Sequence, residues 1–300
     1  MLQQTTVAAV KPYFARFTER WPTVQALAAS PEGEVMAAWA GLGYYSRARN
    51  LVKAAREVAR LGGFPQTEAE LRMLPGFGTY TAAAVAAIAF DERAVVVDAN
   101  VERVVARLHA IAEPLPGGRK AIRGAAERIT PDARAGDFAQ AMMDLGATIC
   151  MPRVPKCLLC PLREHCRGHA SGTPEAYPVK PAKRAVPERV GQTYWLEQDG
   201  KVWLVTRPAE AMLGGMRALP DDGWSARANG SGEPPLPGEW KPAGEVRHGF
   251  THAKLTLAVL IYEGRNEPTG AGKWWPVAQL EKAGLPTLFA KAAKLALKAR

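Results

Sequence analysis

The chain contains little cysteine and no long hydrophobic run. Only four of its 300 residues are cysteines, and all four lie between positions 150 and 166. A disulfide framework would distribute its bridges through a small secreted domain, so this clustering predicts metal ligands instead. No run of about 18 apolar residues could span a membrane, and the first residues lack the basic and apolar regions of a secretory signal. We therefore expect a cytoplasmic protein that does not bind membranes.

Acidic residues are fewer than basic ones. Lys and Arg number 39 and Asp and Glu number 29, which gives a formal net charge of +10. A surplus of positive charge attracts polyanions, and nucleic acid is the most common soluble one. Many basic proteins bind no nucleic acid, so the charge leaves both possibilities open. With 47% hydrophobic residues, the chain is globular and long enough for one or two domains.

Residues 1–169 are predicted to form a mainly helical domain. Apolar residues recur at helical spacing in Leu51–Val58, and Thr67 with Glu70 makes a capping-box pattern for the next helix. Further helices are expected over residues 81–90, 101–111 and 138–148.

The second half of the chain has strand patterns. Residues 170–190 are rich in proline and basic residues, which is typical of a linker. Two β-rich runs, 193–198 and 201–206, then flank Asp199-Gly200, a strong hairpin signal. Another strand is expected over 255–262 and a basic amphipathic helix over 286–299. Residues 191–300 therefore form a separate α+β domain.

The cysteine spacing predicts an inorganic cluster. Cys150, Cys157, Cys160 and Cys166 place four thiolates within one short segment. Zinc also accepts four cysteines, but zinc ribbons usually place two short pairs further apart. A close middle pair with two outer single cysteines favours an iron–sulfur cluster, although zinc remains the alternative. Such a cluster is expected to be structural and to hold a basic loop that meets phosphate.

Two polar motifs lie upstream of the cysteines. Leu74–Tyr80 resembles a helix-hairpin-helix turn, in which Gly76 and Gly78 would allow close approach of a phosphate to backbone amide groups. Asp98 stands before a helix, where an isolated aspartate is usually the N-cap, and Asn100 could cap equally well. Asp98 also follows an apolar run that would carry it into the interior. A carboxylate there could stabilise the positive charge that develops on a sugar during N-glycosidic cleavage.

Five stretches together resemble the adenine DNA glycosylases (MutY type) of the endonuclease III, or helix-hairpin-helix, superfamily. They are Met1–Thr5, Gly41–Arg47, Leu74–Tyr80, Val97–Val101 and Gln140–Gly146, followed by the cysteines. The resemblance covers nearly all of residues 1–169. It implies a monomeric, nucleoid-associated bacterial enzyme with a [4Fe-4S] cluster. Its substrate would be double-stranded DNA, from which it removes adenine mispaired with 8-oxoguanine or guanine by hydrolysis.

The resemblance implies roles for individual residues. Asp98 would be the catalytic carboxylate, supported by hydrogen bonds from Asn100 and Tyr80. Bifunctional relatives carry a lysine at the position of Tyr80, and because a phenol cannot form a Schiff base, we expect a glycosylase without efficient strand cleavage.

Other residues would contact the DNA. Gln4 and Tyr44 would wedge into the duplex around 8-oxoguanine, although without the family Tyr44 would more often be a core residue. Asp144 would meet the adenine edge, although alone it would be a helix surface charge.

The C-terminal domain resembles the Nudix-like recognition domain of the same enzymes. Leu213–Met216 carries this likeness together with the triplet Phe250, Thr251 and His252, which would contact 8-oxoguanine. The glutamate-rich Nudix box is absent, since Gly214 to Asp222 contains only Asp221 and Asp222 as acids. Pyrophosphohydrolase activity is therefore not expected.

One departure concerns the start of the chain. The family uses a glutamate as general acid at adenine N7, two residues before the methionine that matches Met1, and this sequence starts after it. Either the start is assigned to an internal methionine or the gene is truncated, and the intact pattern favours the first. Alternatives are a non-catalytic lesion-binding protein and an endonuclease III-like glycosylase/lyase, which Tyr80 disfavours. A Nudix hydrolase fused to a helical adaptor is disfavoured by the missing box.

We expect the printed chain to bind a duplex with an A:8-oxoguanine mispair but to excise adenine slowly. General acid catalysis contributes about 10²–10⁴-fold, so a version lengthened upstream to include the glutamate should be faster by about that factor. Single-turnover excision by both versions checks this, with equilibrium binding as the control. Equal excision rates would contradict the assigned need for that glutamate.

Overall fold

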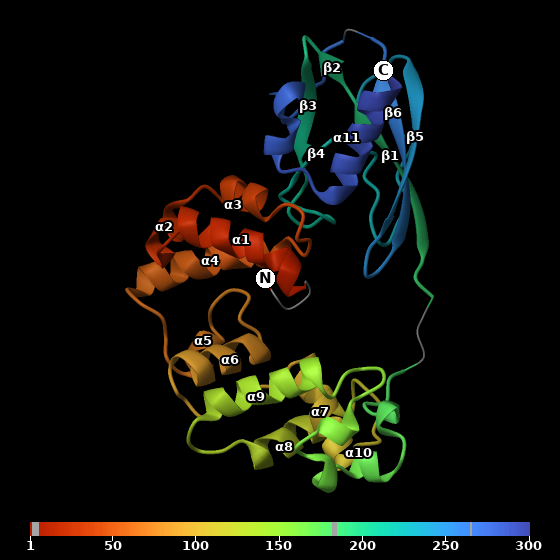
Figure 1. The fold of residues 1–300 in the computed structure, drawn as a ribbon. Helices are drawn as coiled ribbons and strands as arrows, with labels where there is room; N and C mark the ends of the chain where they lie inside the picture. Colours follow the sequence, from red (N-terminus) through yellow and green to blue (C-terminus); the bar gives the residue numbers. More distant parts are fainter. Residues whose placement is uncertain (2–5, 182–184, 265) are drawn as a thin grey trace. The chain divides into compact units, whose positions relative to one another are not determined.

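A computed structural model describes residues 1, 6–181, 185–264 and 266–300 (Figure 1). Its α-helices are α1 (Val7–Arg20), α2 (Val24–Ala29), α3 (Glu32–Trp39), α4 (Ser46–Leu61), α5 (Glu68–Leu71), α6 (Thr79–Ala89), α7 (Ala99–His109), α8 (Arg119–Ile129), α9 (Ala135–Thr148), α10 (Arg167–Ala170) and α11 (Thr287–Ala299). Its strands are β1 (Glu188–Trp195), β2 (Glu197–Gln198), β3 (Lys201–Thr206), β4 (Arg217–Ala218), β5 (Trp240–Gly249), β6 (Lys254–Tyr262) and β7 (Gly272–Pro276). Within the described ranges, no helix is long and apolar enough to cross a membrane.

The chain divides into two compact units that differ from the expected domains. One unit combines residues 1–59 with 184–300, and the other consists of residues 60–183. Apolar residues of α1, α3 and α4 form a cluster with Met216, which is only 1% exposed. Because burial of apolar surface decides which elements group together, the first helices belong with the C-terminal half rather than with residues 60–169. The expected domain boundaries, 1–169 and 191–300, stay predictions.

The expected linker over residues 170–190 also differs in part. Arg107 donates a hydrogen bond from Nε to the carbonyl of Tyr177 at 3.1 Å, which ties this residue to the helical unit. A short helical turn, Pro174–Ala176, precedes it, and β1 already begins at Glu188.

Helix α7 lies at the centre of unit 60–183. Its apolar positions Val101, Val104 and Val105 share one face and are buried in a cluster with residues of α8 and α9. This spacing is the reason why the segment forms a helix with one covered side. The helices expected over residues 81–90, 101–111 and 138–148 correspond to α6, α7 and α9, with ends that differ by a few residues.

Two glycines allow α9 to approach its neighbours. A Cβ atom at Gly136 would collide with the backbone of Ala87 in α6, and one at Gly146 would collide with Asn100 in α7. Helix α9 therefore packs backbone to backbone against the two helices whose first turns carry Tyr80 and Asn100.

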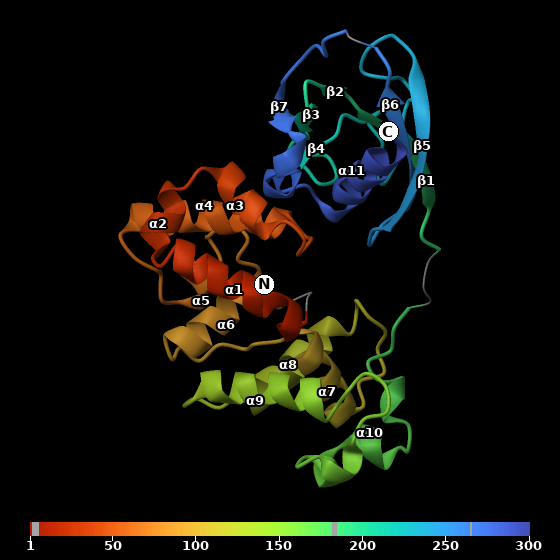
Figure 2. The same ribbon diagram turned by 45° about the horizontal axis from the view of Figure 1, so that its top comes forward.

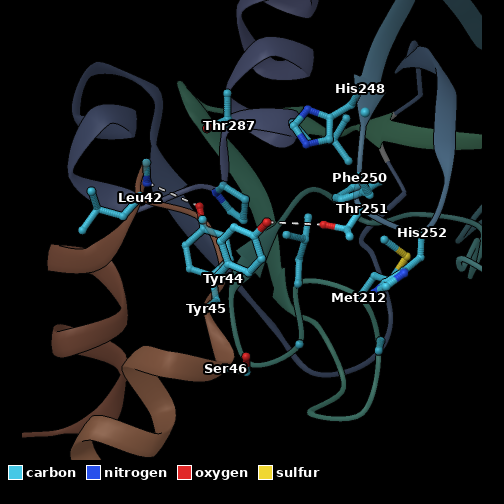
Figure 3. Close-up of a pocket in the computed structure, with 18 of the residues that line it drawn as sticks. Leu42, Tyr44, Tyr45, Ser46, Met212, His248, Phe250, Thr251, His252 and Thr287 are labelled. Carbon is cyan, nitrogen blue, oxygen red and sulfur yellow. Dashed lines mark hydrogen bonds between the residues drawn. The ribbon is translucent and has the colours of Figure 1, made fainter. Parts of the chain in front are cut away.

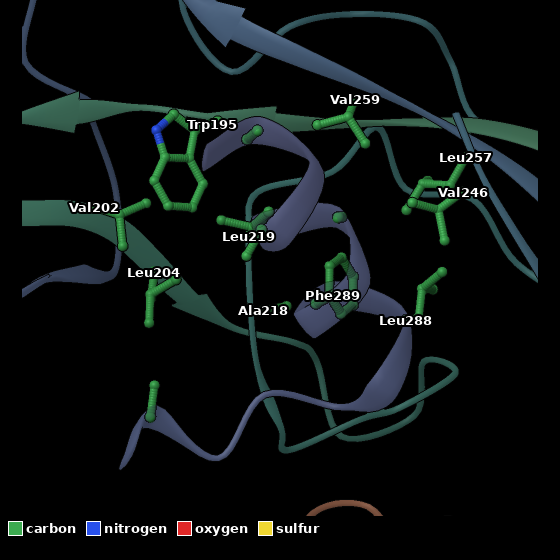
Figure 4. Packing of buried hydrophobic residues seen from close by; sticks show 14 of the residues in the cluster. Trp195, Val202, Leu204, Ala218, Leu219, Val246, Leu257, Val259, Leu288 and Phe289 are labelled. Atoms are coloured by element: carbon green, nitrogen blue, oxygen red, sulfur yellow. The ribbon is translucent and has the colours of Figure 1, made fainter. Parts of the chain in front are cut away.

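The C-terminal half contains two sheets that share one helix (Figure 2). One sheet has the order β1-β6-β5, with β1 and β6 parallel, and the other has the order β2-β3-β4, with β7 paired to β3. Helix α11 packs its buried face, which includes Leu288 and Phe289, against residues of both sheets such as Leu204 and Leu257 (Figure 4). The expected hairpin at Asp199-Gly200 is confirmed, since both residues have positive φ and β2 pairs with β3.

Candidate functional site

The glycine turn between α5 and α6 presents free amide groups. Thr67 caps α5 by accepting a hydrogen bond from the amide of Glu70, as the sequence predicts. Gly76 has φ 80°, a left-handed conformation that favours glycine. Gly78 is the N-cap of α6 and supplies no side-chain acceptor. The first amide groups of α6 are therefore available to an outside acceptor such as a phosphate oxygen.

Asp98 is the N-cap of α7. Its Oδ1 accepts hydrogen bonds from the amides of Asn100 at 2.8 Å and Val101 at 2.7 Å. Its Oδ2 accepts a bond from Nδ2 of Asn100 at 3.1 Å. The side chain is half-buried. A carboxylate held by three donors keeps one orientation.

A buried arginine holds Asn100 in turn. Nη2 of Arg103 donates to Oδ1 of Asn100 at 2.9 Å and to the carbonyl of Gly146 at 2.6 Å, and its Nε donates to the carbonyl of Cys150 at 2.7 Å. Arg103 is only 8% exposed. A continuous set of hydrogen bonds therefore runs from the carboxylate of Asp98 to the backbone of the first cysteine.

Tyr80 lies near Asp98 without a hydrogen bond between them. Burial raises the pKa of the Tyr80 phenol, and the negative charge of Asp98 raises it further, so the phenol stays protonated near neutral pH. Its hydroxyl donates to Sδ of Met143 at 3.6 Å, which differs from the expected support of the carboxylate. Asp144, next to Met143 on α9, is exposed, as the surface-charge interpretation predicts.

The cysteine loop is held by a second buried arginine. Arg107, which is 2% exposed, donates to the carbonyls of Met151 at 2.7 Å and Pro152 at 3.1 Å and to Sγ of Cys150 at 3.3 Å. Burial raises the pKa of Cys157, and the other three cysteines raise it further. Four thiols with this mutual effect and a neighbouring guanidinium suit a cationic metal group that would keep them deprotonated.

The four cysteines lie close together in the fold. They line a common small cavity together with Arg107. In the described part of the chain, no three His, Cys, Asp or Glu side chains are arranged to hold a single metal ion.

A pocket of about 490 Å³ lies in the other unit, between the turn before α4 and the loop that joins β5 to β6. Figure 3 shows Tyr44 and Thr251 on its opposite walls, with their hydroxyl oxygens 3.4 Å apart. Tyr44 has φ 47°, is 47% exposed, and has the guanidinium of Arg47 over its ring. An exposed tyrosine with a strained backbone is not a core residue, so this structure favours a binding role.

The expected triplet forms the tip of the β5–β6 hairpin. The amide of Phe250 donates to the carbonyl of Ala253, and the Phe250 ring lies 4.5 Å from that of His248. Thr251 and His252 are exposed beside them. Burial lowers the pKa of His248, and the charge of Lys291 lowers it further, so its imidazole is neutral near pH 7. The pocket therefore combines aromatic faces with hydroxyl and imidazole groups, and Arg49 also lines it.

Asp221 and Asp222, the two acids between Gly214 and Asp222, both make contacts inside the C-terminal half. Asp221 pairs with Arg207 inside the domain, and Asp222 accepts a hydrogen bond from the amide of Gly232 at 3.2 Å.

The structure brings together only part of the expected site residues. Asp98, Asn100, Tyr80 and the four cysteines belong to unit 60–183, as do Gly76, Gly78 and Asp144. Tyr44, Phe250, Thr251 and His252 share the pocket in the other unit. Gln4 lies outside the described residues. Sequence reasoning missed Arg103 and Arg107. The two arginines lie four residues apart in α7, beside its apolar face. This spacing was the sequence signal that could have predicted their burial.

Comparison with known proteins first shows the protein superfamily to which the helical part of the chain is similar. The profile of HhH-GPD superfamily base excision DNA repair proteins matches residues 1–131, and that of NUDIX domains matches residues 192–295. A thermostable thymine-DNA glycosylase of known structure superposes with a TM-score of 0.51 at 32% identity, covering 57% of this chain and 80% of that one. The helical half thus has the fold of the base-excision repair glycosylases.

Three curated relatives narrow the class further. The adenine DNA glycosylase of Homo sapiens is 35% identical over 97% of this chain and 65% of its own length, and that of Rattus norvegicus is 34% identical over 97% and 69%. The enzyme of Mycolicibacterium smegmatis is 43% identical over 58% of this chain and 60% of its own. The chain belongs to the adenine DNA glycosylase family. It spans about two thirds of the length of its mammalian relatives.

Replacing Arg103 should destabilise unit 60–183. Arg103→Lys keeps the charge but cannot reproduce the forked contacts to Asn100, Gly146 and Cys150, so the free energy of unfolding should fall by about 2–4 kcal/mol. Urea denaturation measures this. Arg119→Lys is the matched control, because its exposed pair with Glu102 should contribute less than about 1 kcal/mol. Equal losses in both variants would contradict the structural role of Arg103.

Proposed function

We propose that the protein hydrolyses the N-glycosidic bond of adenine mispaired with 8-oxoguanine or guanine in double-stranded DNA. The observation that carries this proposal is the half-buried carboxylate of Asp98, held by three hydrogen bonds and backed by Asn100 and Arg103. Cleavage of this bond gives the sugar positive charge, and a fixed carboxylate beside the anomeric carbon stabilises that charge. The family membership agrees with this chemistry.

The duplex would be engaged through the glycine turn. The uncapped first turn of α6 offers amide groups to a backbone phosphate, and Gly76 allows the close approach. The adenine must leave the base stack to reach Asp98, which costs a few kcal/mol. Asp144 and Gln4 stay proposed contacts to the adenine and to the opposite base.

Recognition of 8-oxoguanine is assigned to the pocket of Tyr44, Phe250, Thr251 and His252. An aromatic face stacks on a base, and hydroxyl and imidazole groups can bond the extra hydrogen-bonding atoms at N7 and O8 of an oxidised guanine. The neutral His248 adds no charge that would favour an anion over a base.

The protein is proposed to be monofunctional. Strand cleavage by β-elimination needs an amine that forms a Schiff base with the sugar, and Tyr80 occupies the position where lyases have lysine. The protonated phenol near Asp98 can only donate or accept a hydrogen bond.

Cys150, Cys157, Cys160 and Cys166 would hold a [4Fe-4S] cluster. When bound, the cluster would cross-link the four cysteines and so hold the segment 150–166 in one conformation. Arg107 fixes the backbone at Met151 and Pro152, which orients the adjacent basic segment that contains Arg153 and Lys156 toward phosphate.

A second candidate function is lesion binding without excision. It is favoured by the geometry of Asp98, because both carboxylate oxygens already accept the hydrogen bonds of an ordinary helix cap.

Asp98→Asn separates the two functions. Asparagine caps a helix as well as aspartate does, so folding and DNA binding should be retained. Loss of the charge should slow excision by about 100-fold or more. Single-turnover excision is measured on an A:8-oxoguanine duplex with the printed and the lengthened chain, and thermal melting confirms that the cap survives. Unchanged excision by the lengthened Asp98→Asn chain would rule out the catalytic role.

The cluster can be tested by composition. Purified protein should contain about four iron atoms per chain and negligible zinc. Cys157→Ser should lose iron and lower the melting temperature by several degrees, whereas Leu158→Ser, at an 80% exposed neighbouring position, should change neither. Stoichiometric zinc in place of iron would contradict the assignment.

A further inference from the structure

A basic basin lies in unit 60–183, at the end of α7 opposite to Asp98. It is a hollow of about 590 Å³ whose floor consists of small residues of α8 and whose wall includes His109, the last residue of α7. Lys120 and Arg128 stand on α8, and Arg167 comes from α10. Two elements, α8 and α10, therefore bring positive charge to one place.

These cations are not neutralised within the described chain. Lys120, Arg128 and Arg167 form no ion pair there, although other surface arginines, such as Arg119 and Arg123, pair with glutamates. The basin holds a single acid, the exposed Glu113. Three unpaired cations against one carboxylate leave a net positive potential, which favours an anion with more than one negative charge.

His109 supplies an independent observation. Its Nε2 is buried and has no hydrogen-bond partner among the described residues. A buried polar atom without a partner is costly, and such atoms usually meet a ligand or an ordered water. Burial lowers the pKa of His109, and the positive charges of Arg128 and Arg167 lower it further.

We propose that this basin is a binding site for a phosphate group. The shape supports it, because Gly124 and its small neighbours leave the floor open between Lys120 and Arg128. A phosphate offers several acceptor oxygens and up to two charges, which matches two guanidinium groups and one ammonium group. The phosphate can belong to a DNA backbone or to a free phosphate or phosphomonoester.

The site is independent of the proposed excision chemistry. It shares no residue with the Asp98 network or with the pocket of Tyr44 and Thr251. A failure of the phosphate site would therefore not contradict the proposed excision of adenine. A failure of the excision assays would likewise not contradict the phosphate site.

The test follows the imidazole of His109 by NMR in the full chain. His109→Gln identifies its signal among the five histidines. Inorganic phosphate is titrated at constant ionic strength, and the signal should shift in a saturable manner with a raised His109 pKa. Arg128→Gln and Lys120→Gln should each weaken phosphate binding by about tenfold, because each removes one charge-assisted contact.

Arg119→Gln is the matched control. It removes the same charge from the same helix but lies outside the basin, so phosphate binding should stay within about twofold of the unmodified chain. A linear, non-saturable shift, or equal weakening in Arg119→Gln, would show general charge attraction and overturn the proposal.

A second arm identifies the source of the phosphate. A short duplex without a mispair is added at the same ionic strength. A saturable shift of the His109 signal that Arg128→Gln weakens assigns the site to the DNA backbone. A response to phosphate alone assigns it to a free phosphate or phosphomonoester. Absence of both responses would refute the site, whatever the excision assays give.

Discussion

The guanidinium of Arg103 joins the first turn of α7 to Gly146 and Cys150, which lie 43 and 47 residues further along the chain. It is almost fully enclosed and contacts Asn100 in the first turn of α7, Gly146 near the end of α9, and Cys150 at the start of the cysteine loop. A buried charge is tolerated only where its donors find acceptors, so these three segments must keep their relative positions. The orientation of the Asp98 carboxylate therefore depends on a residue that does not touch it.

The same constraint explains the small residues of α9. A side chain at Gly146 would occupy the space of Asn100, and the carbonyl of Gly146 would then move away from Arg103. Gly136 permits the corresponding approach to α6, whose first turn carries Tyr80. Close backbone packing is what places a phenol, an amide and a carboxylate around one point without any of them being part of the core.

Short-range patterns were sufficient for several elements. The apolar spacing of α7, the Thr67 cap and the Asp199-Gly200 hairpin each depend on neighbouring residues, and the structure confirms all three. Strand β5 was missed because most of its residues are exposed, so its sequence lacks apolar alternation. The grouping of α1–α4 with Met216 depends on contacts between segments about 200 residues apart, which no local pattern encodes.

For the candidate site, the sequence indicated the functional side chains but not the residues that hold them in place. Aspartate before a helix, four spaced cysteines and an aromatic-hydroxyl triplet are visible as residue types. Arg103 and Arg107 lie four residues apart beside the apolar face of α7, and the structure shows that both are buried. The cap and the catalytic interpretations of Asp98 are also not exclusive. The donors that cap α7 hold the carboxylate in one rotamer, and such fixation is what electrostatic stabilisation of a sugar cation requires. A helix start is thus a suitable scaffold for this chemistry, because the backbone itself orients the acid.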